Sequence, residues 1–174
     1  MQALERMLLS LSIDENYTLS TSPASGHSLN AEHLHKYLSK VFYKRRSEFN
    51  PLWNHVLVGG FDSEGKPFLG SADLLGTTFL APTLATGFGT QIALPILRKV
   101  AKDDEAASKL SKEEAINAIT ESLKVLYYRD ARSSREYSIA VITKDGVELK
   151  NEQELEQQSW AFAEKIRGYG RTTE

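Results

Sequence analysis

Two amphipathic helices are predicted in the first 50 residues from the spacing of apolar positions. In the first of them, apolar residues recur at i, i+3, i+4 and i+7, namely Leu4, Met7, Leu8 and Leu11. The stretch from Ser20 to Ser28 is rich in Ser, Thr, Gly and Pro, so it predicts a loop. Ser28 or Asn30 then serves as the N-cap of the second helix.

The second helix is predicted to bury one face and to end in a cluster of cations. Its buried face carries Leu34, Tyr37, Leu38, Val41 and Phe42. The cations at its end, which suit the negative end of the helix dipole, are Lys44, Arg45 and Arg46. Pro51 prevents the helix from continuing.

From residue 53 the apolar positions shorten into β-rich runs. Trp53 to Phe61 and Pro67 to Leu74 flank the turn Asp62-Ser63-Glu64-Gly65 and predict a hairpin. A third strand is predicted from Thr77 to Ala81. The segment from Ala85 to Thr90 then predicts a turn that leads into a helix. That helix carries Ile92, Ile96, Leu97 and Val100, and Pro95 weakens its start.

The second half begins with the clearest helix start in the chain, the capping box Ser111-Lys112-Glu113-Glu114. The helix ends near Tyr127-Tyr128-Arg129-Asp130, and strands from Tyr137 to Thr143 and from Val147 to Leu149 predict a second hairpin. A polar stretch from Glu152 to Gln158 precedes a short last helix that Gly168 ends. This order of elements favours an α+β fold in which helix layers cover antiparallel sheet.

Composition excludes several classes of protein and site. The 174 residues fit one domain, and the absence of cysteine excludes disulfides, thiolate zinc sites and cysteine nucleophiles. A net charge of -2 gives no electrostatic case for nucleic acid or anionic lipid, and no apolar stretch reaches the roughly 20 residues that span a bilayer. We therefore expect a soluble protein of the cytoplasm and nucleus, with no nucleic-acid, membrane or small-molecule partner.

Four features of the sequence could suggest a functional site, but each has a simpler structural explanation. His33 and His35 lie two apart on a helix and point away from each other, so we expect surface histidines and no metal site or other cofactor. Gly87-Phe88-Gly89 lacks the ending of a phosphate-binding loop and predicts a plain turn. Trp53 and Trp160 are predicted to be core or interface anchors. An ion-pair network is predicted from Arg129, Arg132 and Arg135 around Asp130 and Glu136.

Four stretches, taken together, resemble the β-type subunits of the eukaryotic proteasome core particle. They are Tyr43-Lys44-Arg45-Arg46-Ser47 leading to Asn50-Pro51-Leu52-Trp53-Asn54, then Phe68-Leu69-Gly70, then Pro82-Thr83-Leu84-Ala85-Thr86-Gly87-Phe88-Gly89, then Leu126-Tyr127-Tyr128-Arg129-Asp130-Ala131-Arg132-Ser133. The Tyr-Arg-Asp-Ala element is shared across the family, whereas the first and third stretches resemble a non-catalytic member.

The resemblance implies an N-terminal-nucleophile hydrolase fold, an αββα sandwich of antiparallel sheets between helix layers. Family members carry several strands before their first long helix, and this sequence begins within that helix. We therefore expect residues 1–174 to form one β-type domain that lacks its first strands. In catalytic relatives those strands supply the N-terminal threonine nucleophile and the acidic residue and lysine that tune it, so no catalytic residue can be assigned here.

The resemblance also marks positions that belong to the family's site. Catalytic relatives place a serine between two glycines where this chain has Gly87, Phe88 and Gly89, and a phenyl ring cannot join the hydrogen bonds of an N-terminal amine. Asp130 and Ser133 match positions that support that amine elsewhere in the family. Without the nucleophile, Asp130 is expected to hold the turn after its helix by bonding to backbone or to an arginine.

The implied function is that of a non-catalytic structural β subunit, which supports ring assembly and the chamber for ubiquitin-dependent proteolysis. Its partners would be other α and β subunits in a stacked-ring hetero-oligomer, and the tail from Gly168 to Glu174 would help clamp the two β rings. The candidate interface residues are Arg45, Arg46, Arg132, Arg135 and Tyr169.

Two alternatives remain at the level of sequence. One is a catalytic threonine protease subunit of the same fold whose first segment is missing from this sequence. The other is an unrelated α+β binding module. Loss of the family's first strands would expose sheet edges and an apolar face, so we expect the 174-residue chain to be either an incomplete gene model or unstable alone.

Overall fold

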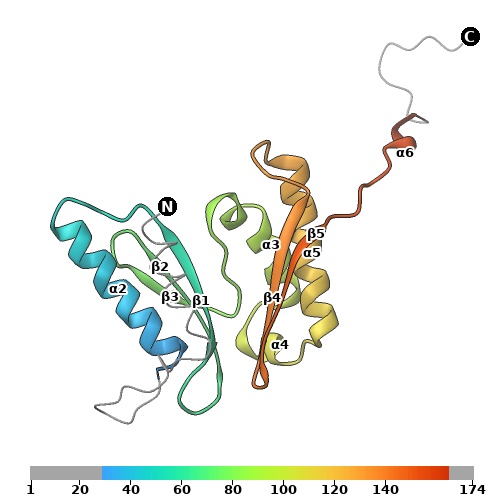
Figure 1. The fold of residues 1–174 in the computed structure, drawn as a ribbon. Helices are drawn as coiled ribbons and strands as arrows, with labels where there is room; N and C mark the ends of the chain where they lie inside the picture. Colours follow the sequence, from blue (N-terminus) through green and yellow to red (C-terminus); the bar gives the residue numbers. More distant parts are fainter. Residues whose placement is uncertain (1–28, 165–174) are drawn as a thin grey trace, which may run out of the picture.

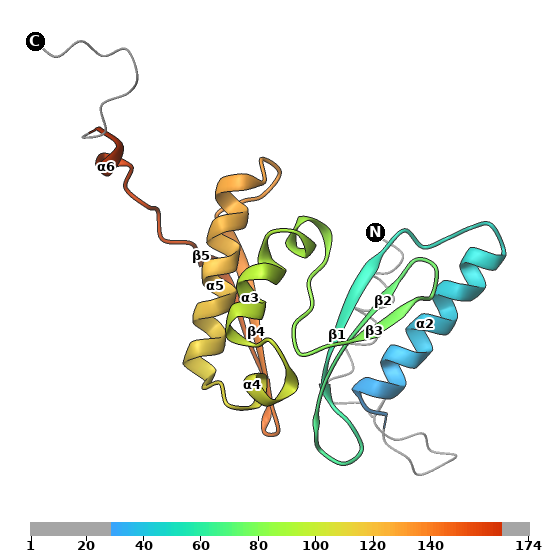
Figure 2. The same cartoon turned by 180° about the vertical axis from the view of Figure 1, so that it is seen from behind.

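The structure, a computed structural model, describes residues 29–164 and arranges them in four layers (Figures 1 and 2). Helix α2 (Ala31–Ser47) covers one face of a three-stranded antiparallel sheet made of β1 (His55–Phe61), β2 (Pro67–Asp73) and β3 (Thr78–Leu80). A second antiparallel sheet contains β4 (Glu136–Thr143) and β5 (Gly146–Glu154). The helices α3 (Ala93–Val100), α4 (Asp104–Ser108) and α5 (Lys112–Arg129) lie beyond it, and α6 (Ala161–Glu164) stands away from the body. The order helix, sheet, sheet, helix agrees with the predicted αββα layering.

Helix α2 is fixed at its N-terminus by a capping box. The side chain of Asn30 accepts a hydrogen bond from the backbone N–H of His33, while the His33 ring accepts one from the N–H of Asn30. Of the two predicted N-caps, Asn30 is therefore the one used. His33 completes the cap, the role that Glu or Gln more often takes.

The hydrophobic core between α2 and the first sheet is small and excludes solvent. Leu38 and Phe42 are almost fully buried and pack with Val58 of β1 and Ala72 of β2. Two expectations for α2 are wrong: Tyr37 is 53% exposed, and His35 is buried and not on the surface. The buried stripe is thus centred on positions 35, 38 and 42, which places Tyr37 at its edge.

His35 can be buried because its ring finds a partner on the sheet. Its Nε2 lies 2.8 Å from the backbone oxygen of Ser71, and the ring meets Phe68 edge to face at 5.4 Å between centroids. A carbonyl can only accept, so Nε2 must carry the proton. Burial is therefore compatible with a polar ring whose donor is satisfied.

The two turns of the first sheet are built alike. Asp62 and Asp73 each use Oδ1 to accept hydrogen bonds from the N–H groups two and four residues later. Gly65 and Gly76 follow in the left-handed region, with φ of 73° and 81°. This is the form of a hairpin loop in which a turn is followed by a left-handed glycine, and it fixes the antiparallel register of β1, β2 and β3.

The second half of the chain has the predicted order of helices and strands, with one additional helix. The capping box at Ser111 and Glu114 is present, with α5 beginning at Lys112. Pro95 lies in the first turn of α3, where its missing N–H removes no helical hydrogen bond. The short helix α4 was not predicted. It is capped by Asp103, whose side chain accepts from the N–H of Ala106.

Strand β5 runs to Glu154, past the predicted end at Leu149. The pairing with β4 shifts between Tyr137 and Ile139, and Glu152 adopts a φ of 54° there. Polar residues can extend this strand because nearly all of its side chains are exposed. The predicted first helix, at residues 4–11, and the predicted helix end at Gly168 lie outside the described residues.

Candidate functional site

The residues that the resemblance marks as a site belong to two turns at one end of the molecule. Residues Gly87–Thr90 form a short 3-10 helix, which packs against α3 and α5. It lies toward the end of the molecule at which α5 finishes, the end that carries Asp130 and Ser133 (Figure 1). The structure therefore brings these positions to the same region.

The two glycines of the first turn serve different purposes. Gly87 has a φ of 59°, in the left-handed region, and no atom lies within 4 Å of where a Cβ would stand. Gly89 is buried, and an added Cβ would lie 3.2 Å from the Cβ of Ala85. Between them, Phe88 is 58% exposed and presents only a hydrocarbon ring. This turn thus offers no side-chain donor or acceptor at its centre.

Asp130 and Ser133 hold the turn that follows α5. The Oδ1 of Asp130 accepts from the N–H of Arg132 at 2.9 Å. The hydroxyl of Ser133 donates to the backbone oxygen of Asp130 at 2.6 Å and lies 3.4 Å from the oxygens of Leu126 and Tyr127. The expectation that Asp130 bonds to backbone in this turn is confirmed. Its carboxylate and the Ser133 hydroxyl are engaged in local structure.

The predicted network of arginines around Asp130 is wrong. Arg135 instead forms an ion pair with Glu154 across the second sheet, next to the hydrogen bond from the N–H of Leu155 to the oxygen of Arg135. Arg132 is exposed, and its backbone, not its guanidinium, contacts Asp130. The sequence could not distinguish these pairings because Arg135 and Glu154 are 19 residues apart.

The other candidate interface residues lie in the last turn of α2 or outside the described residues. The Nε of Arg45 donates to the backbone oxygen of Asn50 at 2.8 Å, so this side chain also closes the end of its helix. Arg46 is exposed. Tyr169 lies beyond the part of the chain that the structure describes. Trp53 and Trp160 are 81% and 59% exposed, so neither is a core residue, and their role as interface anchors stays a prediction.

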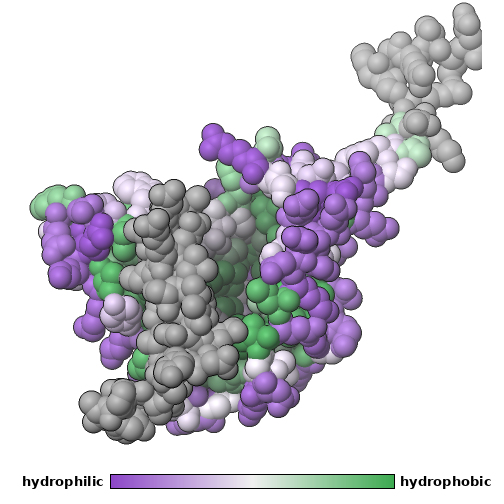
Figure 3. Space-filling view, viewed as in Figure 1, coloured by the Kyte–Doolittle hydropathy of each residue, from purple (hydrophilic) through white to green (hydrophobic). Residues whose placement is uncertain are grey.

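An apolar groove of about 850 Å³ lies between the two sheets and was not foreseen as a site. Figure 3 shows apolar atoms gathered in this hollow. Its walls come from β1, β2, β4, α3 and α5, and they include Leu57, Leu69, Leu97, Ile116, Ile119, Leu123, Ile139 and Ile142. The sheets come close where an added Cβ on Gly59 would lie 3.3 Å from Cδ1 of Ile142. Such a lining can bury apolar surface but supplies little for acid–base chemistry.

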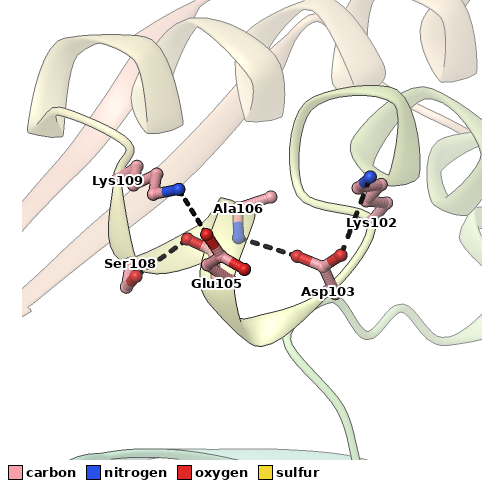
Figure 4. Close-up of polar contacts among 6 residues, drawn as sticks. All are labelled: Lys102, Asp103, Glu105, Ala106, Ser108 and Lys109. Atoms are coloured by element: carbon pink, nitrogen blue, oxygen red, sulfur yellow. Dashed lines mark hydrogen bonds and ion pairs between the residues drawn. The ribbon is translucent and has the colours of Figure 1, made fainter.

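Polar clusters elsewhere are structural. Figure 4 shows one around α4, where Lys109 pairs with Glu105, Lys102 pairs with Asp103, and Ser108 donates to the oxygen of Glu105. All four charged side chains are more than half exposed. Exposed pairs of this kind add little to stability.

The groups with shifted pKa values belong to caps and surface ion pairs. The hydrogen bond and charge of Glu148 raise the pKa of Lys112 above its ordinary value, and Lys112 followed by Lys150 lowers the pKa of Glu148. Hydrogen bonds from the backbone and side chain of Ser111 lower the pKa of Glu114. Each shift has a structural cause. Glu114 completes the cap of α5, Lys112 connects that helix to Glu148 of β5, and Lys150 pairs with Glu148 within the same strand.

Residues 29–164 contain neither a metal-binding cluster nor a membrane-spanning helix. Within that range, no three His, Asp or Glu side chains come together in a way that could hold a metal ion. His33 is engaged in the cap of α2, His35 is buried against Ser71, and His27 lies outside the range. None of the helices in this range has both the length and the apolarity needed to cross a bilayer.

Comparison with known proteins places these features in a family. The family model described as "Proteasome subunit" matches residues 15–142. The chain is 47% identical over 174 residues to the probable proteasome subunit beta type-7 of Schizosaccharomyces pombe, and 43% identical over 171 residues to proteasome subunit beta type-7 of Saccharomyces cerevisiae. It is 42% identical over 168 residues to proteasome subunit beta type-4 of Xenopus laevis.

These matches cover nearly all of the chain but only part of each relative. They take in 99%, 98% and 97% of this chain, against 63%, 64% and 65% of the three relatives. The chain thus spans somewhat under two thirds of the length of these curated relatives. The mixed helices and antiparallel sheets agree with the N-terminal-nucleophile hydrolase fold of the family. The three relatives named above are β-type subunits, and the chain belongs to the proteasome subunit family.

Proposed function

We propose that this chain is a non-catalytic, structural β subunit of the proteasome core particle. The proposal rests on the side chains that occupy the positions of the family's catalytic site. A phenyl ring stands at Phe88, and the polar groups of Asp130 and Ser133 are bonded to backbone within one turn. A nucleophile needs a base or amine within hydrogen-bond reach, and these side chains are not arranged to supply one.

Exposed apolar side chains outside these turns support a role in assembly. Large apolar side chains are exposed on both sheets, including Phe79, Leu80, Val147 and Leu149, each at least 59% exposed. Exposed apolar surface of this extent is typical of a subunit whose neighbours cover it. We infer that the neighbours are other α and β subunits in stacked rings, and that the assembly works in ubiquitin-dependent proteolysis in the cytoplasm and nucleus.

The test measures the size of the complex that contains the endogenous chain and whether the chain is labelled by an electrophile. The cell lysate is fractionated by gel filtration, and the fractions that contain the chain are treated with an electrophile that requires a hydroxyl nucleophile and its own free α-amine. Mass spectrometry then reports which subunits carry the label. We expect the chain in a very large complex, with label on other subunits and none on this one.

Two results would overturn the proposal in different ways. Elution near 19.4 kDa would support an independent binding module. Label on this chain would support a catalytic threonine protease subunit. A Phe88→Ser variant serves as the matched control, because restoring a hydroxyl between the two glycines should not by itself produce labelling.

A further inference from the structure

The loop that joins α2 to β1 exposes two large aromatic side chains. Phe49 is 96% exposed and Trp53 is 81% exposed, the highest values among the large apolar residues described. Leu52, which lies between them in the sequence, packs against the core formed by α2 and the first sheet. The loop is therefore anchored to the core at Leu52, while its two aromatic rings remain in solvent.

Phe49 occupies a backbone position that usually belongs to glycine. The N–H of Phe49 donates to the oxygen of Arg46 at 3.1 Å, and the N–H of Asn50 donates to the oxygen of Arg45 at 3.0 Å. These two bonds form a Schellman motif at the end of α2, with Phe49 at its left-handed residue and a φ of 55°. A side chain with a Cβ is disfavoured there.

The loop is held rigidly around this strained residue. The Nε of Arg45 donates to the oxygen of Asn50, and the hydroxyl of Ser47 donates to the oxygen of Tyr43, each at 2.8 Å. Pro51 follows directly and restricts the backbone further. Because the loop is already ordered, a partner that contacts Phe49 would not have to pay the conformational entropy of fixing it.

Packing among residues 29–164 gives no reason for an aromatic ring at residue 49. The ring buries almost nothing against this part of the chain, and its Cβ makes the left-handed backbone more costly than a glycine would. A residue that lowers stability and gains no internal contact is expected where the contact is made with another molecule. Rigid, exposed aromatic side chains are the usual anchors of protein interfaces.

The charges around Phe49 indicate what kind of surface it fits. The last turn of α2 carries three cations, Lys44, Arg45 and Arg46. The adjacent carboxylate, Glu48, lies 3.9 Å from Lys44, and both side chains are more than half exposed. The rim of the aromatic anchor is therefore positive, and a complementary surface would be an apolar pocket with an acidic rim.

We propose that Phe49 inserts into an apolar pocket with an acidic rim on another subunit of the proteasome core particle, and that Trp53 packs beside it. This inference rests on the proposed function, because the partner is a subunit of the same assembly. Arg46 contributes to the charge complementarity at the rim. The anchor belongs to the loop that joins α2 to β1, whereas the turns at Phe88 and Asp130 belong to the segments before α3 and after α5 (Figure 1).

The first test uses a substitution that should stabilise the free chain but weaken its assembly. Phe49→Gly relieves the left-handed strain, so it should raise the unfolding temperature of the free chain by roughly 2–4 °C. In cells that express tagged wild-type and variant chains together, its share of assembled particles should fall about tenfold or more. Phe49→Tyr, which keeps both the ring and the strain, is the matched control and should assemble like wild type.

A second test identifies the partner. Phe49 is replaced by the photoreactive analogue benzoylphenylalanine, and purified particles are irradiated. We expect one crosslink, to an apolar pocket of a different subunit that has acidic residues at its rim. Crosslinking to a second copy of this chain, or no crosslink within the particle, would overturn the inference. Arg46→Glu should reduce assembly with Phe49 unchanged.

The two proposals fail in distinguishable ways. If the wild-type chain is absent from large complexes, the proposed function is wrong. If the wild-type chain assembles and Phe49→Gly assembles equally well, the proposed function stands and the anchor at Phe49 is wrong. Should the free chain be too unstable for a melting curve, the contrast between Phe49→Gly and Phe49→Tyr in assembled particles still decides the question.

Discussion

A buried histidine and the glycine opposite it illustrate how single residues set the packing of α2. The imidazole of His35 lies against β2, and its Nε2 contacts the backbone oxygen of Ser71. This approach is possible because residue 70 has no side chain: a Cβ on Gly70 would stand 2.8 Å from Nε2 of His35. Gly70 and His35 therefore pack as a pair: the ring at residue 35 fits only if residue 70 has no side chain.

The first prediction concerns this pair. Gly70→Ala should destabilise β2 by about 1–3 kcal/mol, because the ring is buried and cannot move aside without losing Ser71. His35→Ala alone should also destabilise, since it removes the ring and leaves the Ser71 oxygen without that donor. Together the two changes should cost less than their sum by about 1 kcal/mol, because the alanine at 70 then fills space the ring has left.

Hydrogen exchange of the β2 amides in the native assembly would measure these changes as differences in local opening free energy. Gly59→Ala is the matched control: its Cβ would meet Cδ1 of Ile142 at 3.3 Å, and that flexible end can shift. Strict additivity of the Gly70 and His35 changes would contradict the direct clash.

At the scale of elements, one ion pair connects the start of α5 to β5. Lys112 contacts Glu148 at 2.8 Å, and Lys150 contacts the other oxygen of Glu148 at 3.1 Å. Lys112 lies in the first turn of its helix, where the dipole does not favour a cation, so the interaction with Glu148 offsets an unfavourable position. Both side chains of the main pair are about half exposed, with 48% and 47% of their surface accessible.

The second prediction is the pH dependence of this connection. The folded pKa of Glu148 is lowered, so the pair's contribution is complete above the unfolded value of 4.5 and is lost as pH falls through the lower folded value. The folded pKa of Lys112 is raised, so its contribution is complete below 10.5 and is lost as pH rises through the higher folded value.

Glu148→Gln should therefore lower the unfolding temperature slightly at neutral pH, and the difference from wild type should vanish at strongly acidic pH. Added salt should reduce the difference as well. Melting curves between acidic and neutral pH would measure it. Glu64→Gln, which breaks an exposed pair with Lys66 within one hairpin turn, is the control. A difference that persisted under strong acid would show that the variant acts by another route.

At the scale of the whole molecule, the described chain leaves surfaces that its own layers do not cover. Apolar groups are presented by the groove between the sheets, by exposed side chains of β3 and β5, and by the aromatic loop at Phe49. The last described helix, α6, stands apart from the four layers (Figures 1 and 2). Tyr128 holds the segment before it, through a hydrogen bond from the N–H of Gln158 to its hydroxyl and an edge contact with Trp160.

The third prediction concerns the segment beyond α6. Truncation after Ile166 should weaken assembly of the core particle if, as the proposed function implies, the residues that follow contact the other β ring. A loss of about 1.4 kcal/mol at that contact would lower the assembled fraction tenfold under limiting conditions. Native gels would measure the ratio of full to half particles. A tail of equal length with scrambled sequence is the control, and unchanged assembly after truncation would argue against the clamp.

Local signals determined much of this protein from the sequence alone. The capping box at Ser111, the turn from Asp62 to Gly65 and the turn held by Asp130 each depend on atoms within a few residues of one another. The layer order and the family could be predicted too, because the order of helices and strands and the motifs of the resemblance are properties of the linear chain.

Only the tertiary structure decided which side chains are buried and which charges meet. His35 is buried because the backbone oxygen of Ser71, 36 residues later, accepts a hydrogen bond from its ring. Arg135 pairs with Glu154, 19 residues away, in place of Asp130. The end of β5 and the groove between the sheets depend likewise on pairing and packing between distant segments. Spacing along the chain carries no information about such contacts, because the free energy that selects them arises only when the layers come together.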